Sequence, residues 1–234
     1  MNCRVLSLLM MVFIGFASTS QAEGQVPIDQ VPMYGSMDRS AVPELKVSDE
    51  KLISDTTRYY GSREKASAAF VNNGFTYYQR DDLANAMRRF NQAWLLNPIN
   101  PEVFAGFGSI LHDQGKVCEA MQMMEKALTL NPPTFQGIYP DAGRIVTLCA
   151  VNDKALSQES KAQLLERSEA LYKKAEEVEP NKRYVYSSWA TAYYWREKYA
   201  ESWSMVAKER ALGGKPNEKF LSLLRAKMPE PGQK

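Results

Sequence analysis

The chain has few side chains suited to catalysis or metal binding. Its one histidine is His112; Ser109 stands one helical turn before it and Asp113 directly after it. Serine and histidine could begin a nucleophilic triad, but adjacent residues on a helix point in different directions, and no oxyanion hole accompanies the pair. Paired carboxylates, phosphate-binding glycine loops and metal-ligand spacings are missing from the sequence. We therefore expect no catalytic residue, no metal and no cofactor.

Composition narrows the class of partner. The 234 residues include 29 Lys or Arg against 27 Asp or Glu, a net charge of +2, and 44% are hydrophobic. Such a chain is long enough to bury a core. The small positive charge argues against nucleic acid or an anionic membrane surface as the main partner. These numbers indicate a protein that binds other molecules rather than converting them.

The first 22 residues have the layout of a secretory signal peptide. Arg4 precedes an apolar run from Val5 to Ala17, and the small-residue triplet Ser20-Gln21-Ala22 follows. Thirteen residues span about 20 Å as a helix, which is short of the roughly 30 Å hydrocarbon core of a bilayer. We expect cleavage after Ala22 and export to the periplasm of a Gram-negative bacterium, with no membrane insertion afterwards. The alternative is an uncleaved membrane anchor.

Residues 23–47 contain three prolines and show no helical periodicity, so we expect an extended, poorly ordered lead. Ser48 is a candidate N-cap, with acidic residues in the turn after it. The sequence therefore predicts an N-terminal helical cap over residues 48–66, with its helix ending near Gly61.

The middle of the chain repeats itself with a period of 34 residues, in an order of large and small residues that ends on proline. The positions Phe70, Gly74, Tyr77, Ala86, Phe90, Ala93 and Pro98 recur as Phe104, Gly108, Leu111, Ala120, Met124, Ala127 and Pro132. This pattern resembles the tetratricopeptide repeat (TPR), and the order of elements resembles exported proteobacterial proteins of that family. The resemblance implies an all-α fold, an α-solenoid of antiparallel helix pairs, with units over 67–100 and 101–134.

Two altered units and a cap follow. The third unit, 135–182, carries a 13-residue insertion, and Ser157 is a candidate N-cap for a long helix from Gln158 to about Val178. The fourth unit, 183–212, is degenerate and has Glu209 where a small residue is expected. Residues 213–234 are predicted to form a capping helix and tail. We expect one elongated stack with no boundary between cores.

The resemblance also implies that the first helix of each unit faces a concave, partner-binding groove. This groove is predicted to be aromatic and polar, although the same aromatic residues also suit the core. By register its residues are Val71, Phe75, Tyr78, Gln79, Ser109, His112, Arg144, Tyr194 and Trp195.

Two cysteines remain after cleavage of the leader, which contains Cys3. In the fold that the resemblance implies, Cys118 and Cys149 lie at the same end of neighbouring antiparallel helices. They could form a disulfide in an oxidising compartment, or remain as two buried free thiols.

The predicted function is that of a non-catalytic periplasmic scaffold, which binds another cell-envelope protein or peptide in its groove. The alternative is an accessory protein that binds peptidoglycan or another glycan, because aromatic faces also stack on sugar rings. An enzymatic interpretation depends on His112 and Ser109 alone. The sequence leaves the oligomeric state open.

Overall fold

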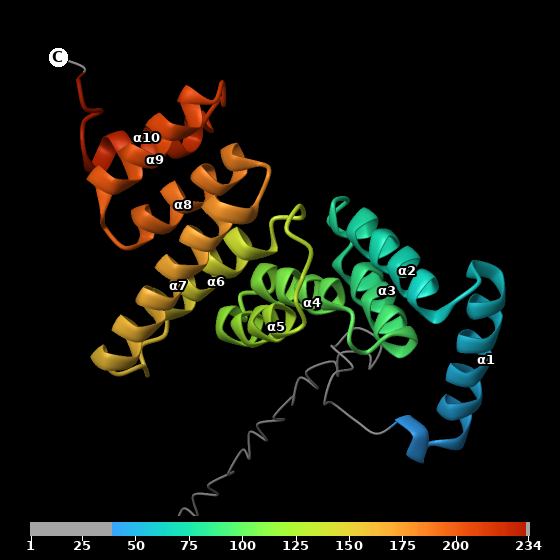
Figure 1. Ribbon diagram of the computed structural model, residues 1–234. Coiled ribbons are helices and arrows are strands. Elements are labelled where there is room, and N and C mark those ends of the chain that lie inside the picture. Colours follow the sequence, from blue (N-terminus) through green and yellow to red (C-terminus); the bar gives the residue numbers. More distant parts are fainter. Residues whose placement is uncertain (1–38, 233–234) are drawn as a thin grey trace, which may run out of the picture.

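The computed structural model describes residues 39–232, and its secondary structure is entirely helical over that range (Figure 1). The predicted signal peptide, and residues 23–38 of the predicted lead, lie outside the described residues. A short 3-10 helix, η2, covers Arg39–Ala41. The α-helices are α1 Pro43–Tyr60, α2 Arg63–Tyr78, α3 Leu83–Leu96, α4 Pro101–Asp113, α5 Val117–Thr129, α6 Ile138–Asn152, α7 Gln158–Val178, α8 Lys182–Trp195, α9 Tyr199–Ala211 and α10 Glu218–Lys227.

Helices α2 to α9 form four antiparallel hairpins stacked side by side, which is an α-solenoid (Figure 1). The repeated small and large residues explain how the two helices of a hairpin pack closely together. A Cβ placed on Gly74 would lie 2.6 Å from the Phe90 ring, and one placed on Gly143 would lie 2.9 Å from the Tyr172 ring. Both distances are shorter than a carbon–carbon contact allows, so the glycine lets a large residue of the second helix pack against the first helix. The predicted fold class is confirmed.

Local sequence signals account for several of the helix ends. Ser157 caps α7 by accepting a hydrogen bond from Ser160 N, and α7 begins at the predicted residue. Helix α3 ends at Leu96, before the Asn97-Pro98 pair. The last helix, α10, is capped by Asn217 and ends at Lys227, within the range predicted for a capping helix and tail.

The start of α1 differs from the prediction. This helix begins at Pro43, so residues 43–47 are helical rather than extended, and Ser48 is not its N-cap. Proline fits the first turn of a helix, because backbone N–H groups there make no intrahelical hydrogen bond and the N–H that proline lacks is not needed. The helix ends at Tyr60, because Gly61 adopts a left-handed conformation with φ of 85°. The first unit starts earlier than residue 67, since Ser62 caps α2.

The buried residues form two clusters rather than one, so the expectation of a stack without a boundary was wrong. The first cluster extends from α2 to α6 and includes Leu171 of α7. The second extends from α7 to α10, and its centre is a stack of the Tyr172, Trp189 and Tyr193 rings. Adjacent residues on a helix point in different directions, so Leu171 and Tyr172 face different clusters. Tyr139 packs against both.

The C-terminal helix α10 covers the end of the second cluster. Leu221 and Leu224 are buried there, whereas Leu223 is 55% exposed. Within residues 39–232, no helix combines the length and the apolarity needed to cross a membrane.

Candidate functional site

A chain of polar side chains crosses the face formed by the first helices of the hairpins, α2, α4, α6 and α8. Near the end of α4, His112 Nδ1 lies 2.8 Å from Asp113 Oδ1, and His112 Nε2 lies 3.0 Å from Arg144 Nη1 on α6. Arg144 Nη2 donates to Asp141 Oδ1 at 3.2 Å, and the Tyr184 hydroxyl of α8 donates to the same oxygen at 2.5 Å. With Tyr78 of α2, which hydrogen-bonds to Asp113, these residues are called the polar seam: Tyr78, His112, Asp113, Asp141, Arg144 and Tyr184.

The hydrogen bonds of the seam indicate which tautomer its histidine adopts. A guanidinium group only donates hydrogen bonds, so His112 Nε2 must accept from Arg144. The proton of the neutral ring is therefore on Nδ1, which donates to Asp113. Both ring nitrogens are engaged in this arrangement, and neither is free to act as a base.

Each end of the seam is a tyrosine that donates to an aspartate. Burial and the hydrogen bond to Asp113 raise the pKa of Tyr78 far above its usual range. Burial and the Asp141 carboxylate do the same to the pKa of Tyr184. Both hydroxyls therefore keep their protons at physiological pH. The seam then carries one guanidinium and two carboxylates, a net charge of −1.

Helix positions explain how these side chains meet. Asp141 and Arg144 are three residues apart on α6, the spacing of an ion pair on one helix face. The Tyr184 ring packs over Gly137 at the start of α6, where a Cβ would lie 2.7 Å from it. That close approach brings the Tyr184 hydroxyl to Asp141, in the first turn of α6.

Three of the residues predicted for the groove meet in the seam: Tyr78, His112 and Arg144. Ser109 does not join them, because its hydroxyl donates to the Ala105 carbonyl at 3.0 Å rather than contacting His112. The expectation that Asp113 would point away from His112 was wrong. Asp113 is the last residue of α4, where no following helical turn restricts its side chain.

Other predicted groove residues have different surroundings. Val71 is 1% exposed and belongs to the first buried cluster, so it cannot line a groove. Phe75 is half-buried, with its ring edge-to-face against Phe90 at 5.0 Å between centroids. Gln79 is exposed at the end of α2. Phe75 therefore contributes mainly to packing.

The last two predicted groove residues lie at the end of α8. The Tyr194 ring packs against the rings of Tyr199 and Phe220, with 5.8 Å between centroids in each pair. Tyr194 is thus part of the packing around the second buried cluster. Trp195 is 49% exposed and lines a pocket with residues of α6 and α7. The predicted groove residues therefore divide between the seam, the core and this pocket.

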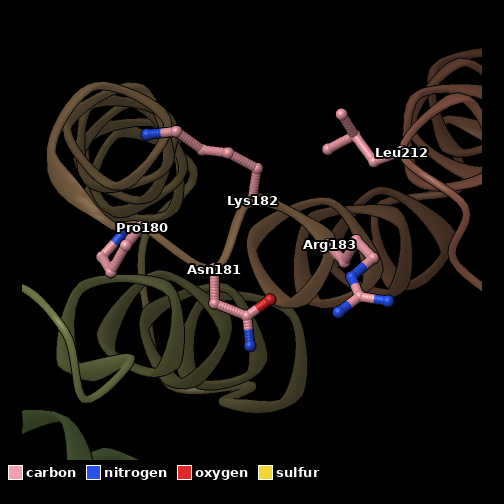
Figure 2. Close-up of a pocket in the computed structure, with 5 residues that line it drawn as sticks. All are labelled: Pro180, Asn181, Lys182, Arg183 and Leu212. Carbon is pink, nitrogen blue, oxygen red and sulfur yellow. The ribbon is translucent and has the colours of Figure 1, made fainter.

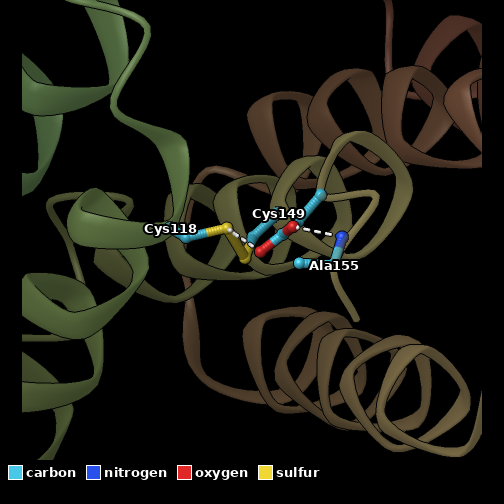
Figure 3. The surroundings of a disulfide bond; sticks show 4 residues. Cys118, Cys149 and Ala155 are labelled. Carbon is cyan, nitrogen blue, oxygen red and sulfur yellow. Dashed lines mark hydrogen bonds between the residues drawn. A yellow bond between two sulfur atoms is a disulfide. The ribbon is translucent and has the colours of Figure 1, made fainter. Parts of the chain in front are cut away.

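Cys118 and Cys149 form a disulfide that joins the start of α5 to the end of α6, with 5.0 Å between the Cα atoms (Figure 3). Asp153 Oδ2 lies 3.8 Å from Cys118 Sγ. A disulfide sulfur carries no hydrogen, so this is a contact and not a hydrogen bond. Asp153 Oδ1 accepts a hydrogen bond from Ala155 N. The two sulfurs and this carboxylate are close enough to hold a metal ion together. Metal binding needs thiolates, however, and the disulfide has consumed both thiols.

A pocket of about 450 Å³ lies at the turn between α7 and α8 (Figure 2). Figure 2 shows Lys182 extending over the end of α7, where its ammonium donates to the Glu176 carbonyl, and Asn181 caps α8. These polar groups hold the turn together. The residues lining this pocket are Pro180, Asn181, Lys182, Arg183 and Leu212.

Comparison with known proteins does not connect the polar seam to a function. No protein-family model matches the chain, and no curated protein matches it. A function therefore has to follow from the residues themselves: the polar seam, the disulfide and the pockets.

Proposed function

We propose that this protein is a non-catalytic scaffold of the periplasm, which holds a segment of another cell-envelope protein against its first helices. The observation that carries the proposal is the polar seam, whose hydrogen bonds run over α2, α4, α6 and α8. Packing alone would not require such a chain of partly exposed polar groups on one face. Repeat solenoids use extended surfaces of this kind for binding, and the TPR-like spacing supports the same use here.

The state of His112 supports a binding role over a catalytic one. Its two ring nitrogens are engaged by Asp113 and Arg144, at 2.8 and 3.0 Å. Ser109, the nearest candidate nucleophile in the sequence, is bonded to a backbone carbonyl. A general base must be free to take a proton from its nucleophile. Binding a partner segment requires no proton transfer. Side chains that are already held in place lose less conformational entropy when the segment binds.

The charge of the seam indicates what a partner offers to it. The Asp113 side chain is 37% exposed and the Asp141 side chain 23% exposed, so both carboxylates can be reached from solvent. They suit backbone N–H groups or a basic side chain of a bound segment. Arg144 balances only one of the two charges. We therefore expect the segment to be neutral or basic where it crosses the seam.

Location in the periplasm is supported by two features of the chain. The first is the signal-peptide layout of residues 1–22. The second is the disulfide between Cys118 and Cys149, since disulfides form and persist in oxidising compartments.

A pair of matched variants tests the proposal. Arg144→Gln breaks a link between the first helices of units two and three. Arg167→Gln breaks a link between their second helices, where Arg167 Nε and Nη2 bond to Glu125 at 3.0 and 2.9 Å. Each variant removes one arginine that joins the same two units. The Arg144 side chain is 26% exposed and the Arg167 side chain 45%, so Arg144→Gln is expected to cost more stability of the two.

The readout is crosslinking in the native cell. A photocrosslinking residue at Gln79, exposed beside the seam, is expected to capture one envelope protein in the wild type and in Arg167→Gln. Capture is expected to fall at least tenfold in Arg144→Gln, with the far-ultraviolet circular dichroism spectrum unchanged. Equal capture in all three proteins would show that the seam does not hold the partner.

A further inference from the structure

The disulfide and the Asp153 carboxylate form a compact group of three side chains that could ligate a metal. The two sulfurs and a carboxylate oxygen of Asp153 all lie within 4.8 Å of one another (Figure 3). Cys118 is in the first turn of α5 and Cys149 is in the last turn of α6, so the group joins two neighbouring hairpins. Within residues 39–232, this is the one group of three or more His, Cys, Asp or Glu side chains that are close enough to share an ion.

The Asp153 carboxylate is held in an orientation that suits a ligand. Asp153 follows Cys149 by four residues at the end of α6, and its backbone N–H donates to the Cys149 carbonyl at 3.0 Å. Its Oδ1 accepts from Ala155 N at 2.8 Å, while Oδ2 lies 3.8 Å from Cys118 Sγ. Carboxylates that bind metals are commonly fixed by a second hydrogen bond of this kind.

The spacing of these atoms suits a tetrahedral zinc ion. With Zn–S bonds of about 2.3 Å and Zn–O bonds of about 2.0 Å, a sulfur and an oxygen ligand lie about 3.5 Å apart. Cys118 Sγ and Asp153 Oδ2, at 3.8 Å, are already close to that separation. The two cysteines need to separate only at their sulfurs, which breaking the disulfide allows.

A dithiol reductant supplies the two thiols. Cys118 is partly exposed and Cys149 is 1% exposed, so a thiolate of the reductant attacks Cys118 Sγ, and Cys149 leaves as a thiolate. The second thiol of the reductant then displaces Cys118 and closes a disulfide within the reductant. Two electrons and two protons have passed to the chain, which now carries two thiols.

We propose that the reduced chain binds one Zn²⁺ through Cys118, Cys149 and Asp153, with water as the fourth ligand. The ion takes the place of one proton on each thiol, so two protons are released. Two thiolates favour a softer metal than Mg²⁺ or Ca²⁺, and the carboxylate oxygen favours Zn²⁺ over Cu⁺. The N-terminal end of α5, which has no side-chain cap, also favours negative charge on Cys118.

The zinc ion restores the link between α5 and α6 that reduction removes. The redox state therefore selects between a covalent link and a metal link at the same position. The expectation that the chain binds no metal rested on spacing along the sequence, and Cys118 and Cys149 are 31 residues apart, too far for such a pattern to reveal them. The zinc site shares no residue with the polar seam, so it does not depend on the proposed function.

The experiment uses the chain from residue 23 onward, which lacks Cys3. The chain is reduced with a phosphine, which is removed under argon before any metal is added. Zn²⁺ is titrated in competition with a chromophoric chelator, and Co²⁺ serves as a probe whose bonds to thiolates absorb in the near ultraviolet. The reduced chain is expected to bind one Zn²⁺ and to show the cobalt–thiolate absorption until Zn²⁺ displaces the cobalt. The oxidised chain is expected to do neither.

Three variants assign the ligands. Cys118→Ser is expected to remove most of the cobalt–thiolate absorption. Asp153→Asn is expected to weaken Zn²⁺ binding by about tenfold or more, since even a residue that only supports a metal ligand is worth that much. Glu119→Gln is the matched control, because Glu119 is exposed next to Cys118 but lies outside the group, and it is expected to bind Zn²⁺ like the wild type. Asp153→Asn keeps the disulfide, so circular dichroism before reduction establishes that it is folded.

The proposal is overturned if the oxidised chain binds Zn²⁺ as tightly as the reduced chain, or if Asp153→Asn binds it as tightly as the wild type. Binding that concentrated urea leaves unchanged would also contradict it, because free thiols of an unfolded chain would then suffice. If reduction unfolds the chain, Zn²⁺ is expected to restore the helical signal in the wild type and in Glu119→Gln but not in Asp153→Asn; no restoration counts against the site. Arg144→Gln is expected to bind Zn²⁺ normally, so failure at the seam and failure at this site are distinguishable.

Discussion

Breaking the Cys118–Cys149 disulfide is expected to lower the free energy of unfolding by about 3–4 kcal/mol. The bond closes a loop between residues 31 positions apart. In the loop-entropy relation, a loop of that size removes about 12 cal/mol/K from the unfolded chain, or about 3.7 kcal/mol at room temperature. The Cα atoms lie 5.0 Å apart, inside the range for bridged cysteines, so the folded state does not have to move to form the bond.

Urea unfolding at pH 7, followed by circular dichroism, measures this difference. Three samples are compared: the oxidised chain, the same chain reduced with a phosphine, and the Cys118→Ala, Cys149→Ala double variant. The reduced chain keeps both side chains, so its loss of stability reports the crosslink alone. The double variant also leaves a small cavity, because Cys149 is 1% exposed, and is expected to be slightly less stable still.

The midpoint of thermal unfolding is expected to fall by about 10 °C on reduction, since each kcal/mol moves it by about 2–4 °C in a chain of this size. The double variant should not respond to the phosphine, which makes it the control for the reagent. Two alkyl groups added by iodoacetamide to the unreduced, unfolded chain would show that the bond does not form. A loss of less than about 1 kcal/mol would refute the loop-entropy reasoning.

Three further changes test the packing and the charges. Gly74→Ala is expected to destabilise the fold by about 1–3 kcal/mol in urea unfolding, because the added methyl group would lie 2.6 Å from Phe90. Glu209→Gln is expected to raise the unfolding temperature at pH 7 but not below pH 4. Burial raises the pKa of this carboxyl above its usual 4.5, so the folded state is stabilised at low pH and loses that advantage as the pH rises. Deleting residues 229–234 removes the 2.5 Å ion pair between Glu230 and Arg210 and is expected to cost about 1 kcal/mol by the same urea assay.

Each of these changes has a control and a contrary outcome. Asn73→Ala alters the exposed neighbour of Gly74 and should leave stability nearly unchanged; equal losses in the two variants would argue against the steric account. If Glu209→Gln raised the unfolding temperature at pH 4 as well, the charge of the Glu209 carboxylate would not be the cause. Glu230→Gln should reproduce most of the effect of the deletion if the ion pair is responsible.

The hairpin architecture could be predicted because its causes are short-range and repeated. Gly74 and Phe90 are the small and large residues on the two helices of the first 34-residue unit, and the structure places them in contact. The start of α7 could be predicted as well, because the Ser157 cap acts on a backbone N–H three residues away. Local chemistry is sufficient in both cases.

The start of α1 could not be predicted in this way. Pro43 is compatible both with an extended segment and with the first turn of a helix. Val42, which precedes the helix, has no side chain that could act as a cap, so the sequence carried no local signal. The packing of α1 on α2 distinguishes the two alternatives, and that contact depends on the whole fold.

The seam could be predicted in part. Repeat register placed Tyr78, His112 and Arg144 on the first helices. The spacing of Asp141 and Arg144 was a further signal for an ion pair on one helix face. The bond from Tyr184 to Asp141, 43 residues away, was hidden because it depends on how α8 packs on the altered third unit. Repeat register alone did not separate groove positions from core positions on α2, where Val71 is buried.

The two buried clusters have a consequence for how the chain opens. Amide hydrogen exchange is expected to group the amides of α2 to α5 separately from those of α8 and α9, with one opening free energy for each group. The hairpin of α6 and α7 belongs to both groups, because Leu171 and Tyr172 side chains face different clusters. The first group also contains the crosslinked loop, so its amides should exchange more slowly. Of the two groups, the one formed by α8 and α9 then opens first, and this opening does not extend past the hairpin of α6 and α7.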